Sequence, residues 1–295
     1  MAITSEIIKC PLTEYDLLPF MQQFGGTDTS PNREEFWTSA KKYTDSSWPG
    51  GKPPKGMSVV YFAGSGSTDY LTETNAIVTA LISSGFTVYS HLRYQTTTPH
   101  PDVSSNPYSG YGQVANPNMM GGNFFTEALN VKAALTAIKE TDSQPKILLS
   151  HSRGSAGVLG YLGLPEEFKI SEDNIHGALI MSPAAAGNGT EHWNGVTRIM
   201  SSMNILFDGL KSMPDNSTIV LWGNNDTYTP PAMQHRIRYS MSKENKTHLI
   251  SVGDLGHNWM SSGTVAIMMR HINSIYTRSK PILNSGDFSV PGRGF

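Results

Sequence analysis

From residue 57 onward, short apolar segments alternate with longer amphipathic ones, and this alternation is the strongest constraint on how the chain can fold. The apolar segments are continuous apolar runs rather than alternations of apolar and polar residues. Strands of this kind are buried on both faces, and strands that alternate with helices form a mostly parallel sheet covered by helices. The sequence therefore predicts an α/β fold with a mostly parallel open sheet flanked by helices. The expected strands are residues 57–62, 86–92, 146–149, 176–181, 219–222 and 247–252, and the expected helices are residues 68–84, 124–139, 153–162, 196–210, 231–242 and 264–276.

The N-terminal 56 residues precede this alternation and are expected to form a separate extension. A strand is expected over residues 6–10. Ser30 is a typical helix cap and Pro31 a typical first helical residue, so a helix is expected to begin there. The extension ends in a linker rich in Pro and Gly at residues 48–54.

Residues 57–277 are expected to form the α/β domain. Its six strands are too few for the competing architecture, a closed barrel of eight strand–helix units. Within it, residues 93–122 form a long loop, and loops of this length are usually functional or disordered. Residues 182–216 have room for one helix and so predict only a short cap over the sheet. Residues 278–295 are expected to be an irregular C-terminal tail.

The composition argues against several classes of function. The 22 Lys and Arg residues nearly balance 24 Asp and Glu residues, so no basic surface for nucleic acid is expected. The single cysteine, Cys10, allows neither an internal disulfide nor a thiolate zinc cluster, and the nine histidines show no metal-binding spacing. Asp69 occupies the third glycine position of a dinucleotide-binding loop that would begin at Gly64. We therefore expect neither a metal nor a cofactor.

The compartment is left open by the sequence. The N-terminus lacks the basic start and apolar core of a secretory signal, and no apolar run is long enough to span a membrane. These features favour the cytoplasm by default. The charged fraction is 16%, below the roughly 25% of an average domain, and this leaves an extracellular or particle-associated role open.

One strand-to-helix junction carries a candidate nucleophile. An expected strand leads directly into an expected helix through Ser150-His151-Ser152-Arg153-Gly154. A nucleophilic serine on such a tight turn needs small residues two positions before and after it, so that strand and helix can pass closely. Ser150 and Gly154 meet this requirement around Ser152. The alternative is a serine that caps an ordinary helix.

A nucleophilic serine needs a general base that is oriented by a carboxylate. Asp226 and His257 each follow a later strand of the alternation. Because the carboxyl ends of parallel strands share one edge, where ligands bind in open α/β sheets, both are expected to meet Ser152 there. Asp254, three residues before His257, is the alternative acid and otherwise a turn carboxylate.

With these motifs the chain resembles the α/β-hydrolase family, in particular its serine esterases and lipases, across residues 57–277. The resemblance rests on SHSRG around Ser152, GNNDTYTPP around Asp226 and GDLGHNW around His257. It implies that Ser152 is the nucleophile and that His257 is the general base and then the general acid. It implies that Asp226 is the carboxylate that fixes the tautomer of His257.

The resemblance also implies an oxyanion hole made of two backbone amides. One is the amide of Arg153, which follows the nucleophile, and the second comes from Gly64, Ser65 or Gly66 after the first parallel strand. Members of the family often have His-Gly where this chain has Ala63-Gly64, so the choice of second amide stays open. Small residues there suit close approach to a developing oxyanion.

Four further residues are expected to contact the substrate: Arg93, Tyr94, His151 and Trp259. Arg93 and Tyr94 begin a long loop rich in aromatic and amide side chains, which would suit an aryl or carbohydrate-linked ester. A structural role for His151, a core role for Trp259 and a solvated loop are the alternatives.

The sequence thus predicts a serine hydrolase that cleaves a small-molecule or polymer-linked carboxylic ester through an acyl-enzyme. Peptide and thioester cleavage, lyase chemistry and transfer chemistry on the same fold remain alternatives. A non-catalytic ligand-binding module of the same fold is an alternative of a different class, because a fold does not determine a function. Oligomeric state is not predicted.

Overall fold

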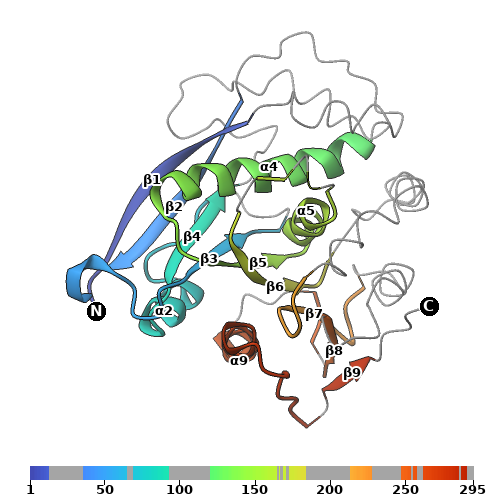
Figure 1. The fold of residues 1–295 in the computed structure, drawn as a ribbon. Helices are drawn as coiled ribbons and strands as arrows, with labels where there is room; N and C mark the ends of the chain where they lie inside the picture. Colours follow the sequence, from blue (N-terminus) through green and yellow to red (C-terminus); the bar gives the residue numbers. More distant parts are fainter. Residues whose placement is uncertain are drawn as a thin grey trace.

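Nine strands among the described residues of the computed structural model form one sheet (Figure 1). Their order across the sheet is β1-β2-β4-β3-β5-β6-β7-β8-β9. Strands β3 to β8 run parallel, whereas β1, β2 and β9 are antiparallel to their neighbours. The predicted mostly parallel open sheet is confirmed. The strands are β1 (Ile3–Leu12), β2 (Phe36–Asp45), β3 (Ser58–Phe62), β4 (Thr87–Leu92), β5 (Lys146–His151), β6 (Ile175–Met181), β7 (Thr218–Gly223), β8 (Thr247–Val252) and β9 (Phe288–Val290). The structure describes residues 1–12, 36–64, 69–92, 120–164, 166, 169–170, 173–183, 213–227, 247–253, 255–257, 262–285 and 287–290.

Helices cover both faces of the sheet. The helices α2 (Ala76–Ser83) and α9 (Ser262–Thr277) lie on one face, and α4 (Met120–Thr141) and α5 (Arg153–Leu162) lie on the other (Figure 1). Side chains of α2 and α9 join those of the central strands in one apolar core cluster. Burial on both faces explains why the central strands are continuous apolar runs.

Most expected elements of the α/β domain form, with shifted ends. The strand at 247–252 has the expected bounds. The helix expected over 68–84 begins only at Ala76, because the Asn75 side chain accepts a hydrogen bond from the Ile77 N–H (2.9 Å) and caps the helix there. Helix α4 begins at Met120, within the expected loop. The helices expected over residues 196–210 and 231–242 lie outside the described residues, as do residues 93–119 of the loop.

The sheet extends across both expected domain boundaries. The helix expected to begin at Pro31 does not extend over residues 36–45, which form β2 and pair with β1 from Ile3↔Asp45 to Leu12↔Phe36. The C-terminal tail is not wholly irregular, because β9 pairs with β8. Ser30 and Pro31 themselves lie outside the described residues.

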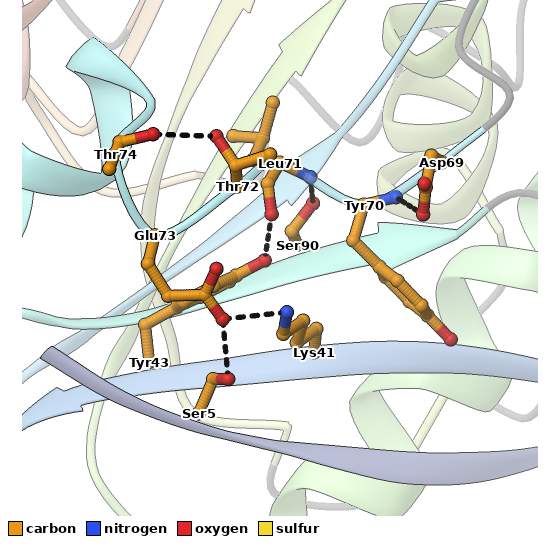
Figure 2. A network of polar contacts seen from close by, with 10 residues as sticks. All are labelled: Ser5, Lys41, Tyr43, Asp69, Tyr70, Leu71, Thr72, Glu73, Thr74 and Ser90. Carbon is orange, nitrogen blue, oxygen red and sulfur yellow. Dashed lines mark hydrogen bonds and ion pairs between the residues drawn. The ribbon is translucent and has the colours of Figure 1, made fainter.

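Polar contacts tie the segment between β3 and α2 to the N-terminal strands (Figure 2). The Glu73 carboxylate accepts a hydrogen bond from the Ser5 hydroxyl of β1 (2.7 Å) and forms an ion pair with Lys41 of β2 (2.7 Å). These two partners lower the pKa of Glu73 to about 2, Lys41 having the larger effect. The Tyr43 hydroxyl of β2 donates to the Leu71 carbonyl. These contacts with β1 and β2 therefore fix the position of the segment between β3 and α2.

A buried histidine on α9 makes the fold sensitive to acid. His271 is fully buried, and neither ring nitrogen has a hydrogen-bond partner among the described residues. Burial and, secondarily, the charge of Arg270 lower the pKa of His271 to about 4, against the opposing effect of Asp287. The ordinary pKa of histidine is about 6.5, so the unfolded chain binds more protons than the folded one between these two values. Stability is therefore lost as the pH falls through this window.

We expect His271→Leu to weaken this dependence of stability on pH. In the wild type, protonation of the unfolded chain at residue 271 should remove about 3 kcal/mol of unfolding free energy between pH 7 and pH 4. Urea unfolding at several pH values measures this loss, with Met268→Leu on the same helix as a control that changes packing without a titrating group. An unchanged pH dependence in His271→Leu would contradict the assignment.

Candidate active site

Three predicted side chains meet at the carboxyl end of the parallel strands. Ser152 directly follows β5, Asp226 follows β7 and His257 follows β8. His257 Nε2 lies 2.8 Å from Ser152 Oγ, and His257 Nδ1 lies 2.9 and 3.0 Å from the two carboxylate oxygens of Asp226. The three side chains thus form a continuous chain of hydrogen bonds.

The direction of these hydrogen bonds follows from chemistry. An ionised carboxylate only accepts, so His257 Nδ1–H donates to Asp226. In a neutral imidazole, Nε2 then has a free lone pair that accepts the Ser152 hydroxyl proton. The Asp226 side chain is fully buried, whereas the His257 side chain is 19% exposed. A buried acid, an oriented imidazole and a hydroxyl in this arrangement can generate a nucleophilic serine.

Ser152 adopts a strained backbone conformation. Its φ of 54° and ψ of −121° are rare for a residue with a side chain. Its N–H donates to the Met181 carbonyl of β6 (3.0 Å), and the Ser155 hydroxyl donates to the same carbonyl (2.9 Å). Such strain persists only when the surroundings hold it, and it is concentrated at functional sites.

The requirement for small residues around Ser152 has a direct structural cause. A Cβ atom at Gly154 would lie 2.3 Å from the Phe62 carbonyl oxygen and 2.6 Å from that of Ala63. Ser150 on the other side is fully buried within the sheet. The helix after Ser152 therefore passes against the end of β3 at a distance that only glycine permits at position 154.

At a second glycine, Gly223, the segments that carry Asp226 and His257 make close backbone contact. A Cβ atom at Gly223 would lie 1.9 Å from the Leu255 carbonyl oxygen. The Asn225 N–H donates to that carbonyl (3.0 Å), so the two loops are joined backbone to backbone. This role of Gly223 was not predicted from the sequence. Its signal was a glycine directly after a buried strand and just before the predicted acid.

The backbone of Gly64 lies close to Ser152. A Cβ atom there would lie 3.0 Å from Ser152 Cβ and 3.5 Å from Ser152 Oγ. Of the other predicted oxyanion residues, Arg153 begins α5, with only its backbone described. Ser65 and Gly66 lie outside the described residues, as does the alternative acid Asp254.

His151 is the candidate substrate contact that the structure describes. It is 8% exposed, and its Nε2 lies 2.7 Å from the backbone carbonyl oxygen of His257. The hydrogen-bond partner of His151 is thus the backbone carbonyl of the candidate base itself. Arg93, Tyr94 and Trp259 lie outside the described residues.

Metal-binding clusters and membrane-spanning helices are absent from the described residues. No group of three or more His, Cys, Asp or Glu side chains there is placed to hold a metal ion. No helix in the described part of the chain is long and apolar enough to cross a membrane.

The protein is similar to known proteins in its three-dimensional structure. No protein-family model and no curated protein matches the chain. A peroxisomal α/β-hydrolase from Saccharomyces cerevisiae matches 96% of this chain and 92% of its own, with a TM-score of 0.55 at 11% identity. A cold-adapted esterase from an Arctic intertidal metagenomic library matches 95% of this chain and 96% of its own, with a TM-score of 0.54 at 13% identity. A predicted hydrolase from Thermoplasma acidophilum matches 93% of this chain and 99% of its own, with a TM-score of 0.53 at 16% identity.

These solved structures share their architecture, rather than their sequence, with the protein described above. The likeness extends over nearly the whole length of the chains compared. It agrees with the resemblance that the motifs around Ser152, Asp226 and His257 predicted. The chain has the α/β-hydrolase fold.

Proposed function

We propose that this protein is a serine hydrolase that cleaves carboxylic esters, with Ser152, His257 and Asp226 as its catalytic triad. The observation that carries the proposal is the unbroken hydrogen-bond chain from the buried Asp226 through His257 to Ser152. The strained conformation of Ser152 supports it, because a serine that merely capped a helix would not need a positive φ.

The geometry suits a two-step reaction through an acyl-enzyme. Ser152 Oγ attacks the ester carbonyl carbon while its proton moves to His257 Nε2. The tetrahedral intermediate then expels the alcohol, which takes the proton from His257 and leaves the acyl group on Ser152. A water molecule, deprotonated by His257, attacks the acyl group. The bond between the acyl carbon and Ser152 Oγ then breaks, His257 returns the proton to Ser152, and the carboxylic acid leaves. Asp226 keeps the proton on Nδ1 and stabilises the imidazolium that forms in each step.

The developing oxyanion needs donors that are already in place. The amide of Arg153, at the N-terminus of α5, is the first proposed donor, and the helix terminus favours negative charge there. Gly64 is proposed as the second, because a Cβ atom there would lie 3.5 Å from Ser152 Oγ, so its backbone is near the attacking oxygen. Ser65 and Gly66 remain the other proposed donors.

Esters are proposed as the substrate class for two reasons. The triad activates an oxygen nucleophile for attack on an acyl carbonyl, and an ester expels its alcohol more readily than a peptide expels its amine. Two solved structures with this fold are esterases, the Arctic enzyme and an esterase domain from Rhodothermus marinus (TM-score 0.52, 11% identity). Aryl and carbohydrate-linked esters are the proposed subclasses, to be tested in a panel with short-chain and long-chain alkyl esters, thioesters and peptides.

Labelling with a fluorophosphonate probe tests the proposal directly. The folded protein should react covalently, and mass spectrometry should place the adduct on Ser152. His257→Ala should abolish the labelling, because the hydroxyl then has no base. Heat-denatured protein is the control for non-specific reaction. A folded protein that resists the probe would favour the non-catalytic binding module instead.

A further inference from the structure

His151 contacts the residue that the proposed mechanism uses as a base. It is the last residue of β5 and precedes Ser152, yet its ring lies against His257, with the ring centroids 5.2 Å apart and the planes at 44°. Its Nε2 lies 2.7 Å from the His257 carbonyl oxygen. The contact therefore reaches the backbone of His257, while the ring of His257 is engaged with Ser152 and Asp226.

The chemistry of this hydrogen bond fixes the state of His151. A carbonyl oxygen only accepts, so the His151 Nε2–H donates and the proton of the neutral ring is on Nε2. Burial is the main cause of a lowered pKa of His151, with the nearby His257 lowering it further and the hydrogen bond to His257 and the charge of Asp226 opposing it. The ring is thus a neutral donor and places no second positive charge beside the imidazolium that His257 becomes during catalysis.

The contact joins the nucleophile and the base into one unit. Ser152 and His151 are neighbours on a turn whose backbone is held by β6 and by the close approach of Gly154 to β3. A hydrogen bond from this turn to the His257 carbonyl oxygen fixes the position of the His257 backbone, from which its side chain extends toward Ser152. Because a misplacement of about 1 Å costs roughly a hundredfold in rate, such a tie has consequences for catalysis.

We propose that His151 is a positioning residue, which holds His257 in line with Ser152 and Asp226 through the hydrogen bond from Nε2–H to the His257 carbonyl. This inference rests on the proposed function, since it assigns His257 the role of base. The expected contact of His151 with substrate stays a separate prediction.

A matched pair of substitutions tests the proposal. His151→Gln places an amide N–H near the position of the imidazole Nε2, whereas His151→Met has a similar length and volume and no donor. We expect His151→Met to lower kcat about tenfold or more with KM within about twofold of the wild type, and His151→Gln to recover most of kcat. His151→Asn carries the same amide on a shorter side chain and should behave like His151→Met. Thermal unfolding establishes which variants are folded. If His151→Gln does not fold, a folded His151→Met or His151→Asn variant with the kcat of the wild type would still contradict the positioning role.

A second readout does not depend on turnover. The His257 Nδ1 proton, donated to a buried carboxylate, should give a slowly exchanging signal in NMR spectra of protein with ¹⁵N-labelled histidine. His151→Met should broaden or remove this signal, and His151→Gln should retain it. Equal kcat in the Gln and Met variants with the signal unchanged would overturn the positioning role, as would a change confined to KM. If the signal responds as expected but the wild type cleaves no ester, the positioning stands and the proposed function fails.

Discussion

Ser152→Ala is expected to reduce ester hydrolysis by roughly 10⁴-fold or more in kcat and to leave the fold intact. The substitution removes the oxygen that accepts the acyl group, and no step of the proposed acyl-enzyme route can proceed without it. The backbone contacts of residue 152, such as its N–H donation to Met181, do not need the side chain. The thermal midpoint should therefore stay close to that of the wild type.

The measurement is the steady-state hydrolysis of the best ester from the panel, together with a thermal melt. Ser83→Ala is a suitable control, because Ser83 is an exposed serine at the end of α2. That variant should keep both its activity and its stability. Turnover in Ser152→Ala within about a hundredfold of the wild type would mean that another group attacks the substrate.

Gly223→Ala is expected to have the largest effect on stability and to impair activity with it. The added Cβ would lie 1.9 Å from the Leu255 carbonyl oxygen and 2.4 Å from its carbon, and both are backbone atoms. The loops that carry Asp226 and His257 must therefore separate. Overpacking of this kind costs about 1–3 kcal/mol and sometimes more, so the unfolding free energy should fall by about 3 kcal/mol. Displacement of the acid from the base should lower kcat in whatever protein remains folded.

Gly253→Ala provides a matched control for this prediction. Gly253 follows β8 on the partner loop, and a Cβ there would meet no atom within 4 Å. Urea unfolding and kcat should be close to the wild type in Gly253→Ala and strongly reduced in Gly223→Ala. Equal behaviour of the two variants would show that the close contact at Leu255 is not what joins these loops.

The elements that could be predicted are those whose burial is reflected in their own content of apolar residues. Strands β3, β5, β6 and β7 carry runs of apolar residues because both of their faces are covered, and the strand at 247–252 is mostly buried although Thr247, His248 and Ser251 interrupt its apolar residues. Ser152, Asp226 and His257 could be found because each follows such a strand, and parallel strands bring their ends to one edge. Their hydrogen bonds then follow from the fold.

The features that could not be predicted depend on contacts between distant segments. Strand β2 contains Lys41, Lys42 and Asp45 and has no continuous apolar run, so only its pairing with β1 and β4 defines it. The contact of His151 with the His257 carbonyl joins residues 106 positions apart, and no local pattern records it. The start of α2 was misplaced because contacts of Leu71 and Glu73 with the first two strands hold that segment outside the helix.

The positive φ of Ser152 sets stability and chemistry against each other at one residue. Strain of this kind costs about 1–3 kcal/mol, and glycine would relieve it because glycine adopts such a conformation readily. Glycine also removes the hydroxyl. A library selected for thermal stability alone is thus expected to favour substitutions that discard the proposed nucleophile, so stabilising this protein as a hydrolase requires selection for both properties together.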